Sequence, residues 1–313
     1  MDASYFINYA ILAAFLSLFT IEVGVATTAL LWWDKYKSKL KRYINPIWAV
    51  NGTFAVFYVV NFEVTYPTLL PTAALVYVGP VLFGALFLIL RNAFIAYSEV
   101  TKALSREKWC ITIYAISTLV IAFVAISVLA SAVSGTGVVG ASTPSPSIDL
   151  FTLFVNPFSL LLFAALTALS LFIATIFFDI KSLRRLALAP LALAVAIVII
   201  DLYLYVPYMF TTLSAGLPLL AMVVAVFALC VFSYYRAHWY AKELAFLGTF
   251  MGTVLFGVLQ YPYLFGGTQA FTGFLNNSLT SQYAGWVTVI GGTFVVIALS
   301  YFVYINYFKS DQD

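Results

Sequence analysis

Two carboxylates stand in long uncharged stretches of this chain, and they are the first candidates for chemistry. Glu22 lies in FTIEVGVATT, and no other acid or base occurs between Tyr5 and Trp33. Asp201 lies in AIVIIDLYLY. Acids in apolar surroundings either take part in proton transfer or stay neutral and hydrogen-bond a neighbouring helix. Both roles remain open for Glu22, whereas the structural role is favoured for Asp201.

Other groups that carry chemistry are scarce. The single histidine, His238, lies in YYRAHWYAKE among charged residues, and a b-type haem normally takes two axial ligands, His with His or Met. Cys110 and Cys230 are far apart in apolar segments, so they indicate neither a disulfide nor a zinc site. No phosphate-binding loop, CxxC or HExxH motif occurs. The sequence therefore predicts no haem ligand, no metal ligand and no catalysis by this chain alone.

The composition is typical of a membrane protein. Hydrophobic residues make up 64% of the 313 residues and charged residues 9%, against roughly 25% charged residues in soluble domains. The chain lacks the ~10-residue alternating segments of a β-barrel, so helices must satisfy the backbone hydrogen bonds in lipid. We therefore expect an all-α integral membrane protein with nine transmembrane helices, at approximately 5–33, 46–65, 72–97, 109–134, 151–178, 185–208, 215–236, 243–265 and 283–308.

The basic residues predict the orientation of these helices. Five of the fifteen lie in DKYKSKLKRY, and the others fall in alternate connections or after the last span. Because basic residues favour the cytoplasmic side, we expect the N-terminus outside and the C-terminus in the cytoplasm. This assignment puts Arg91 at the inner end of the third helix. It leaves no base at the depth of Glu22, about 16 Å from the inner end of the first helix.

Connections and motifs give the organisation along the chain. A Gly-, Ser- and Pro-rich outer loop, 135–150, divides four helices from five and indicates two bundles. Several short motifs then follow one another in a fixed order: INPIWAVNGTF with Trp48 and Asn51, Arg91 in the third helix, NPFSLLLF with Asn156 and Pro157, QYPYLFGG, and NNSLTSQYAGW before the last helix.

This order, its spacing and the predicted topology resemble subunit II of cytochrome bd-type quinol oxidases over most of the chain. The resemblance implies two four-helix bundles and one peripheral helix: a first bundle at 1–134, the outer loop 135–150, a second bundle at 151–265, and an outer loop with the last helix at 266–313. It also implies that this chain has no haem and is not catalytic by itself. The implied complex oxidises membrane quinol and reduces oxygen in a respiratory chain.

The implied partners follow from the same resemblance. A haem-bearing subunit I, holding haems b and d or only b, would form a pseudo-symmetric heterodimer with this chain in the plasma membrane of a prokaryote. Lipids, a structural quinone and small accessory subunits are further expectations, and no nucleic acid is expected. The alternatives left open are a secondary transporter and a structural membrane subunit of another respiratory complex.

The resemblance also suggests roles for single residues. Glu22 falls at the position of the family's first-helix acid, which is associated with proton uptake from the cytoplasm, and Asn51 could hold water beside it. Trp48, Arg91, Asn156 and Pro157 are expected to be structural or helix-end residues, and Asp201 is a secondary intramembrane acid. One departure concerns the second helix, where Ala49 replaces the family's carboxylate and Val50 replaces its glycine.

Overall fold

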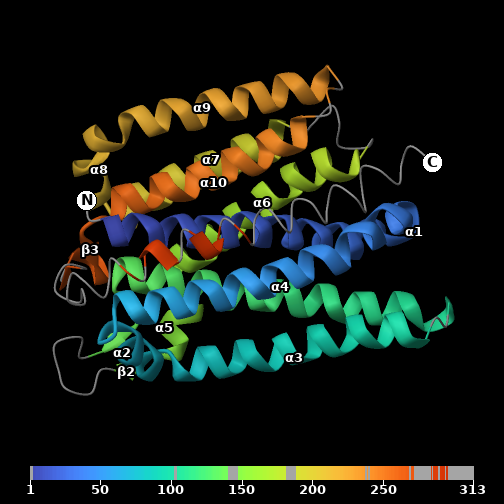
Figure 1. Ribbon diagram of the computed structural model, residues 1–313, viewed down its shortest axis with the longest axis horizontal. Helices are drawn as coiled ribbons and strands as arrows, with labels where there is room; N and C mark the ends of the chain where they lie inside the picture. The colour runs from blue at the N-terminus through green and yellow to red at the C-terminus, as the bar shows by residue number, and fades with distance from the viewer. Residues whose placement is uncertain are drawn as a thin grey trace.

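The computed structural model is a bundle of long helices aligned along one direction (Figure 1). It describes residues 3–101, 104–139, 147–180, 188–236, 238, 240–267, 269–270, 283, 285–287, 290–292 and 294. The elements are α1 (Ala3–Thr65), α2 (Leu69–Val76), α3 (Val78–Thr101), α4 (Leu104–Ser134), β1 (Val138–Val139), β2 (Ser147–Ile148), α5 (Leu150–Phe154), α6 (Pro157–Phe178), α7 (Leu188–Tyr205), α8 (Tyr208–Thr211), α9 (Leu213–Tyr235), α10 (Ala241–Gln260), β3 (Tyr263–Leu264), the 3-10 helix η2 (Phe265–Gly267) and β4 (Gln269–Ala270).

Within the described residues, eight helical segments are long and apolar enough to cross a membrane. They are Tyr5–Ile44, Pro46–Thr65, Val78–Ser98, Glu107–Ser134, Leu150–Phe178, Leu188–Tyr205, Leu213–Tyr235 and Ala241–Gln260. They correspond to the first eight predicted spans, so the expectation of an all-α, multi-pass membrane protein is confirmed. The ninth predicted span, 283–308, lies largely outside the described residues. The count of nine and the orientation therefore stay predictions, as do the domain boundaries.

The first helix differs most from expectation. The basic stretch after residue 33 was expected to be a loop, but α1 continues through it and breaks its helical geometry only at Trp32, where φ is −143° and ψ is 31°. Residues 33–44 remain helical because they contain no glycine or proline, and Pro46 then begins the second transmembrane limb. Figure 1 shows α1 turning back at the end of the molecule opposite α2 and α8.

Proline also divides the third predicted span, 72–97, into α2 and α3. Its ring nitrogen carries no hydrogen, so Pro80 cannot donate the helical hydrogen bond to the carbonyl of Val76. The chain turns at Tyr77, whose φ is −98° and ψ is 16°. The transmembrane helix α3 thus begins later and extends further, to Thr101, than the sequence suggested. This shift changes the depth of the residues on α3.

Asn156 and Pro157 lie together at the start of α6. The Asn156 side chain accepts a hydrogen bond of 2.8 Å from the backbone N–H of Phe158, and Pro157 occupies the first helical turn. An amide side chain at this position satisfies a backbone donor that the helix leaves free, and proline loses nothing there. The pair allows a bend between α5 and α6 without an unsatisfied helix end.

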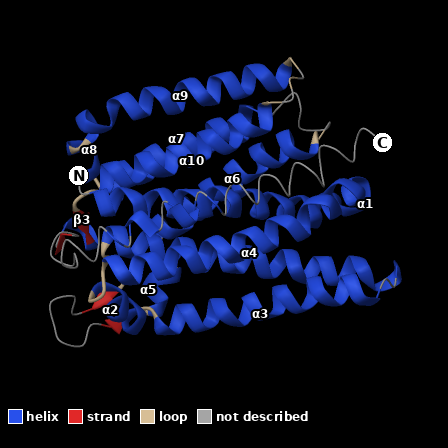
Figure 2. Ribbon diagram, in the orientation of Figure 1, coloured by secondary structure: helices blue, strands red, loops and turns tan. Residues whose placement is uncertain are grey.

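The short strands lie at one end of the bundle (Figure 2). β1 pairs with β2 and β3 pairs with β4, both antiparallel. At the other end lie basic residues at the start of α4, at the end of α9 and at the start of α10: Lys108, Arg236 and Lys242. We call this basic end, which is predicted to be cytoplasmic, the inner end, and the end with the strands the outer end.

α1 packs at the centre of the bundle. Its residues contact α4, α6 and α10, so it joins helices of both predicted bundles. The largest core cluster combines α1 residues such as Val25 and Ala26 with Phe172, Ile173 and Ala174 of α6. Most buried serine and threonine hydroxyls donate a hydrogen bond to the carbonyl one turn earlier in their own helix, as Thr27 does to Val23 at 2.8 Å. They therefore need no hydrogen-bond partner on another helix.

Gly24 marks the closest approach between α1 and α6. A Cβ atom added at Gly24 would lie 2.8 Å from the backbone oxygen of Ser170 and 3.2 Å from Cβ of Ala174. Small residues at such a crossing let two membrane helices pack backbone against backbone. Because the obstructing atom belongs to the backbone, a side chain at this position requires the helices to separate.

We expect Gly24→Ala to destabilise the protein by about 1–3 kcal/mol through this separation. Gly52→Ala is the matched control, since nothing lies within 4 Å of its added Cβ, and alanine in a helix should stabilise by about 0.5–1 kcal/mol. The thermal unfolding midpoints of the purified variants in detergent would test this. Equal shifts for both variants would contradict the close packing of α1 on α6.

Candidate functional site

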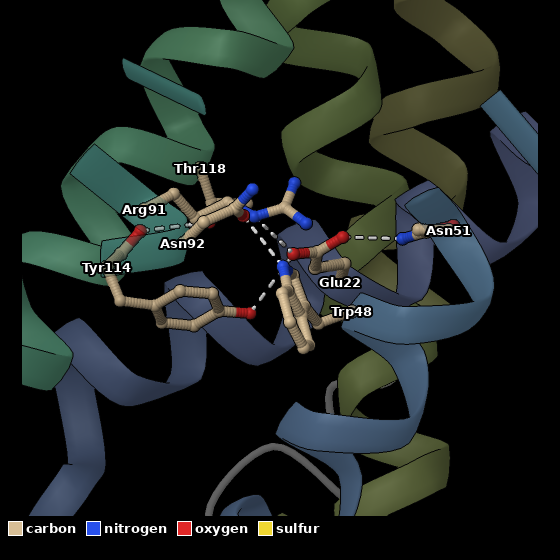
Figure 3. Close-up of polar contacts among 7 residues, drawn as sticks. All are labelled: Glu22, Trp48, Asn51, Arg91, Asn92, Tyr114 and Thr118. Atoms are coloured by element: carbon tan, nitrogen blue, oxygen red, sulfur yellow. Dashed lines mark hydrogen bonds and ion pairs between the residues drawn. The ribbon is translucent and has the colours of Figure 1, made fainter. Parts of the chain in front are cut away.

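A cluster of polar side chains from four helical segments surrounds Glu22 (Figure 3). Glu22 lies on the first limb of α1 and is fully buried, with 0% of its surface exposed. Asn51, on the second limb of α1, donates a hydrogen bond from Nδ2 to Oε2 of Glu22 at 2.5 Å. Tyr114 of α4 donates a longer one, of 3.4 Å, from its hydroxyl to Oε1. The carboxylate is thus held from two sides.

Arg91 of α3 completes the surroundings of this carboxylate. Its Nε lies 3.3 Å from Oε1 of Glu22, and its side chain is 5% exposed. The expectations that Arg91 anchors a helix end and that no base lies at the depth of Glu22 are therefore wrong. The reason is that α3 both begins later than predicted, at Val78, and extends further, to Thr101, so Arg91 lies ten residues, about 15 Å, before the end of the helix.

Two further contacts hold the residues of the cluster in place. Trp48, three residues before Asn51 and so on the same face of the helix, donates from Nε1 to Oδ1 of Asn92 at 2.7 Å. This bond joins the second limb of α1 to α3 beside Arg91. On α4, the hydroxyl of Thr118 bonds to the backbone oxygen of Tyr114 at 2.9 Å. The four segments are therefore linked through polar contacts at one level.

Sequence reasoning missed Asn92 and Tyr114. Asn92 had a signal, since Arg91 and Asn92 are adjacent polar residues in an otherwise apolar helix. Tyr114 had none, because it stands among hydrophobic residues of the kind that fill the core. Only the packing of α4 against α1 brings its hydroxyl to the carboxylate.

The cluster also contains buried polar atoms that make no hydrogen bond within the described part of the chain. They are Oδ1 of Asn51 and Nε of Arg91, whose contact with Glu22 is an ion pair without hydrogen-bond alignment. The buried hydroxyls of Thr28 and Tyr36, further towards the inner end of α1, are likewise unbonded to described residues. Buried polar groups are normally satisfied, by protein or by ordered water. These atoms therefore suit a hydrated path.

Ala49 stands where the family resemblance expects a carboxylate, and it lies outside this cluster. Ala49 is exposed on the surface of the chain, whereas Asn51, two residues later, is buried. The substitution therefore leaves the Glu22 cluster intact.

The remaining candidates lie elsewhere. Asp201 of α7 is fully buried, and neither carboxylate oxygen bonds to a described residue. Within the described residues, no hydrogen bond joins Asp201 to the Glu22 cluster. His238 is exposed and stacks on Tyr240, with ring centroids 5.1 Å apart. Among the residues with described positions, no group of three or more His, Cys, Asp or Glu could hold a metal ion; the lack of haem and metal ligands in the whole chain stays a prediction.

A cavity of about 120 Å³ lies near the outer end, between the two limbs of α1 and the end of α10. Most of its wall is apolar or aromatic, and its polar groups include Asn8 and Gln260. Asn8 bonds to Thr65 at 2.9 Å and Tyr9 donates to Gln260, so these groups also tie the limbs of α1 to each other and to α10.

The sequence matches the cytochrome bd terminal oxidase subunit II family over residues 3–308. The chain belongs to this family. Among solved structures, subunit II is similar to a chain of the bd oxidase from Geobacillus thermodenitrificans, with 18% sequence identity and a TM-score of 0.79 over 97% of this chain and 98% of that one. No sequence among the curated proteins matches it.

Family membership decides between the alternatives that the sequence left open. The protein is a multi-pass membrane subunit of a bd-type quinol:oxygen oxidoreductase, in a complex with a partner subunit. It is neither a secondary transporter nor a subunit of an unrelated respiratory complex. In this family the haems belong in general to the partner subunit.

We expect Arg91→Met to destabilise subunit II by about 3–5 kcal/mol, because it leaves the buried Glu22 without its compensating charge. The double variant Glu22→Gln/Arg91→Met should recover part of this loss, since both charges are then absent. Thermal unfolding midpoints in detergent would measure both effects. Arg236→Met, at an exposed position at the end of α9, is the control and should shift the midpoint little. If the double variant loses as much stability as the two single variants added together, the two side chains are not coupled.

Proposed function

We propose that subunit II conducts protons from the inner end towards the partner subunit, with Glu22 as the carrier. The observation that supports this most directly is a fully buried carboxylate beside one base and one amide, in a region where charges are costly. Such residues in membrane helices face a protein interior or a water path and usually have a function. The family resemblance of Glu22 points to the same role.

The path from the inner end to Glu22 is short. Asn51 is five residues after Pro46, where the second limb begins, which corresponds to about 7.5 Å along the helix. The unbonded oxygen of Asn51 and the hydroxyls of Thr28 and Tyr36 offer acceptors or donors for water along this distance. A proton entering at the inner end would thus reach Glu22 through water and hydroxyl groups. Ala49, which is exposed on the surface of the chain, takes no part in this path.

Arg91 supplies the charge that lets Glu22 release its proton inside the bundle. When Glu22 is ionised, it forms a neutral pair with Arg91. When Glu22 is protonated, the pair carries one positive charge, so the two states differ by one proton. The ion pair has no hydrogen-bond alignment at Nε. A contact of this kind can be loosened and re-formed during proton transfer without breaking a well-aligned hydrogen bond.

We also propose the finer features of the complex that the resemblance implies. Subunit II holds no haem, since its single histidine is exposed near the inner end. Subunit I carries haems b and d, or b alone, oxidises membrane quinol and forms a pseudo-symmetric heterodimer with this chain. The complex lies in the plasma membrane of a prokaryote, with small accessory subunits. The complex also holds a structural quinone or lipid, for which the cavity of about 120 Å³ near Tyr5 and Tyr9 is too small.

We expect Glu22→Gln to slow oxygen consumption on the order of tenfold or more per assembled complex, because glutamine keeps the shape and the contact with Asn51 but cannot carry a proton. Oxygen uptake with quinol as donor, normalised to the haem content of the purified complex, measures this. Glu22→Asp should retain part of the activity, and Glu63→Gln, which changes an exposed acid on the second limb of α1, should retain all of it. Unchanged turnover in Glu22→Gln would return Glu22 to a structural role.

We expect subunit II produced without its partner to show no haem bands in a reduced-minus-oxidised spectrum, and to show them only when a haem-rich partner co-purifies. Mass determination of the same sample identifies what accompanies the chain. Haem bound to the isolated subunit would overturn the proposal that it carries none.

A further inference from the structure

We propose that residues 33–44 of α1, called here the basic segment, bind the headgroups of anionic phospholipids at the inner face of the membrane. This site is separate from the Glu22 cluster and does not depend on the proposed proton route. It rests on the position of the segment across the end of the bundle, on its two unlike faces, and on its excess of positive charge.

The contacts of the basic segment place it across the inner end. Lys37 and Lys41 both form ion pairs with Glu107 at the start of α4, the first at 2.6 Å. On another side, Lys39 donates to the backbone oxygen of Phe178, the last residue of α6, at 2.9 Å. Tyr43 accepts a bond of 2.9 Å from Lys242 at the start of α10. One twelve-residue helix therefore touches the ends of three others.

The number of residues between the Glu22 level and each end of the basic segment leads to the same placement. Glu22 contacts Asn51, so both lie at one depth. From there, Trp32 lies ten residues towards the inner end, about 15 Å, whereas Pro46 lies only five residues, about 7.5 Å. A helix of about 18 Å joins these two points, so it can advance less than half of its length along the bundle axis. The basic segment must therefore run mainly sideways, near the plane of the membrane surface.

The two faces of the basic segment differ sharply. Trp33, Tyr36, Leu40 and Ile44, at the spacing of one helical face, are each at most 5% exposed and belong to the main core cluster. The opposite face carries exposed bases, among them Lys35, Lys39, Lys41 and Arg42. A helix with one apolar and one basic face that lies in the interface is the form in which proteins bind anionic lipid surfaces.

The charges of this region do not cancel. Without Arg42, the basic segment and its ion-pair partners contain five bases and two acids, Asp34 and Glu107, among the described residues. Lys108 pairs with Asp34 at 2.6 Å, while Glu107 is shared by two lysines. An excess of three positive charges remains on this end of the bundle. The ligand that complements it there is a phosphodiester with a net negative charge, as in phosphatidylglycerol.

The test uses the assembled oxidase complex, purified in neutral detergent and titrated against fluorescently labelled phosphatidylglycerol, with labelled phosphatidylcholine as the zwitterionic comparison. Fluorescence anisotropy gives the dissociation constants. We expect phosphatidylglycerol to bind more tightly, with an affinity that falls as salt is added. Lys35→Gln and Lys39→Gln should each weaken it roughly fivefold, the change that corresponds to about 1 kcal/mol per base near an anionic surface.

Two further variants separate this site from general electrostatics and from misfolding. Glu107→Gln frees two lysines from their ion pairs and should tighten binding, which a misfolded protein would not do. Arg236→Gln removes an exposed base at the end of α9, away from the basic segment, and should leave the affinity within about twofold. The proposal is overturned if the lysine variants bind as the unchanged complex does, if Arg236→Gln loses as much affinity, or if inorganic phosphate displaces the labelled lipid as well as unlabelled phosphatidylglycerol does.

Discussion

A carboxylate buried inside the bundle is the constraint on which the inner half of this structure depends. An isolated charge in a low-dielectric interior costs several kcal/mol, so a buried acid must find a base and hydrogen-bond donors within a few ångströms. Glu22 finds Arg91, Asn51 and Tyr114. Each of them comes from a different helical segment. The need to surround one side chain therefore brings both limbs of α1, α3 and α4 to a common level.

The rest of the bundle is arranged around α1. Its first limb is the most buried of the candidate spans, while few residues of α7 and α9 are buried. Gly24 lets α6 approach on the side away from the polar cluster, since its missing side chain leaves room for the backbone of Ser170. Between Glu22 and the inner end, the break at Trp32 turns the helix sideways. The basic segment then contacts the ends of α4, α6 and α10. One chain segment thus shapes both the polar site and the inner surface.

A buried ion pair is weak evidence for stability, because well-packed apolar residues often serve a fold at least as well. The Glu22 cluster is also incompletely satisfied, in contrast to the serine and threonine hydroxyls that bond within their own helices. A proton path through a membrane subunit requires a charged pair of this kind, together with polar atoms that are not hydrogen-bonded to the protein. The partner subunit in the bd oxidase provides the redox chemistry with which such a path would be coupled.

The sequence by itself determined the class of the protein, the approximate positions of its first eight spans and the place of Glu22 inside a membrane-spanning helix. Long apolar segments, proline and a lone acid have local physical consequences, and these can be read without coordinates. Only the tertiary structure decided what Glu22 touches. The partner role of Arg91 depended on where Pro80 starts α3, and the role of Tyr114 depended on how α4 packs. The lack of glycine and proline permits a helix at residues 33–44, but their charges favoured a solvated loop, so the sequence left their conformation open. What decided it was burial of Trp33, Tyr36 and Leu40 against helices more than sixty residues away in the chain.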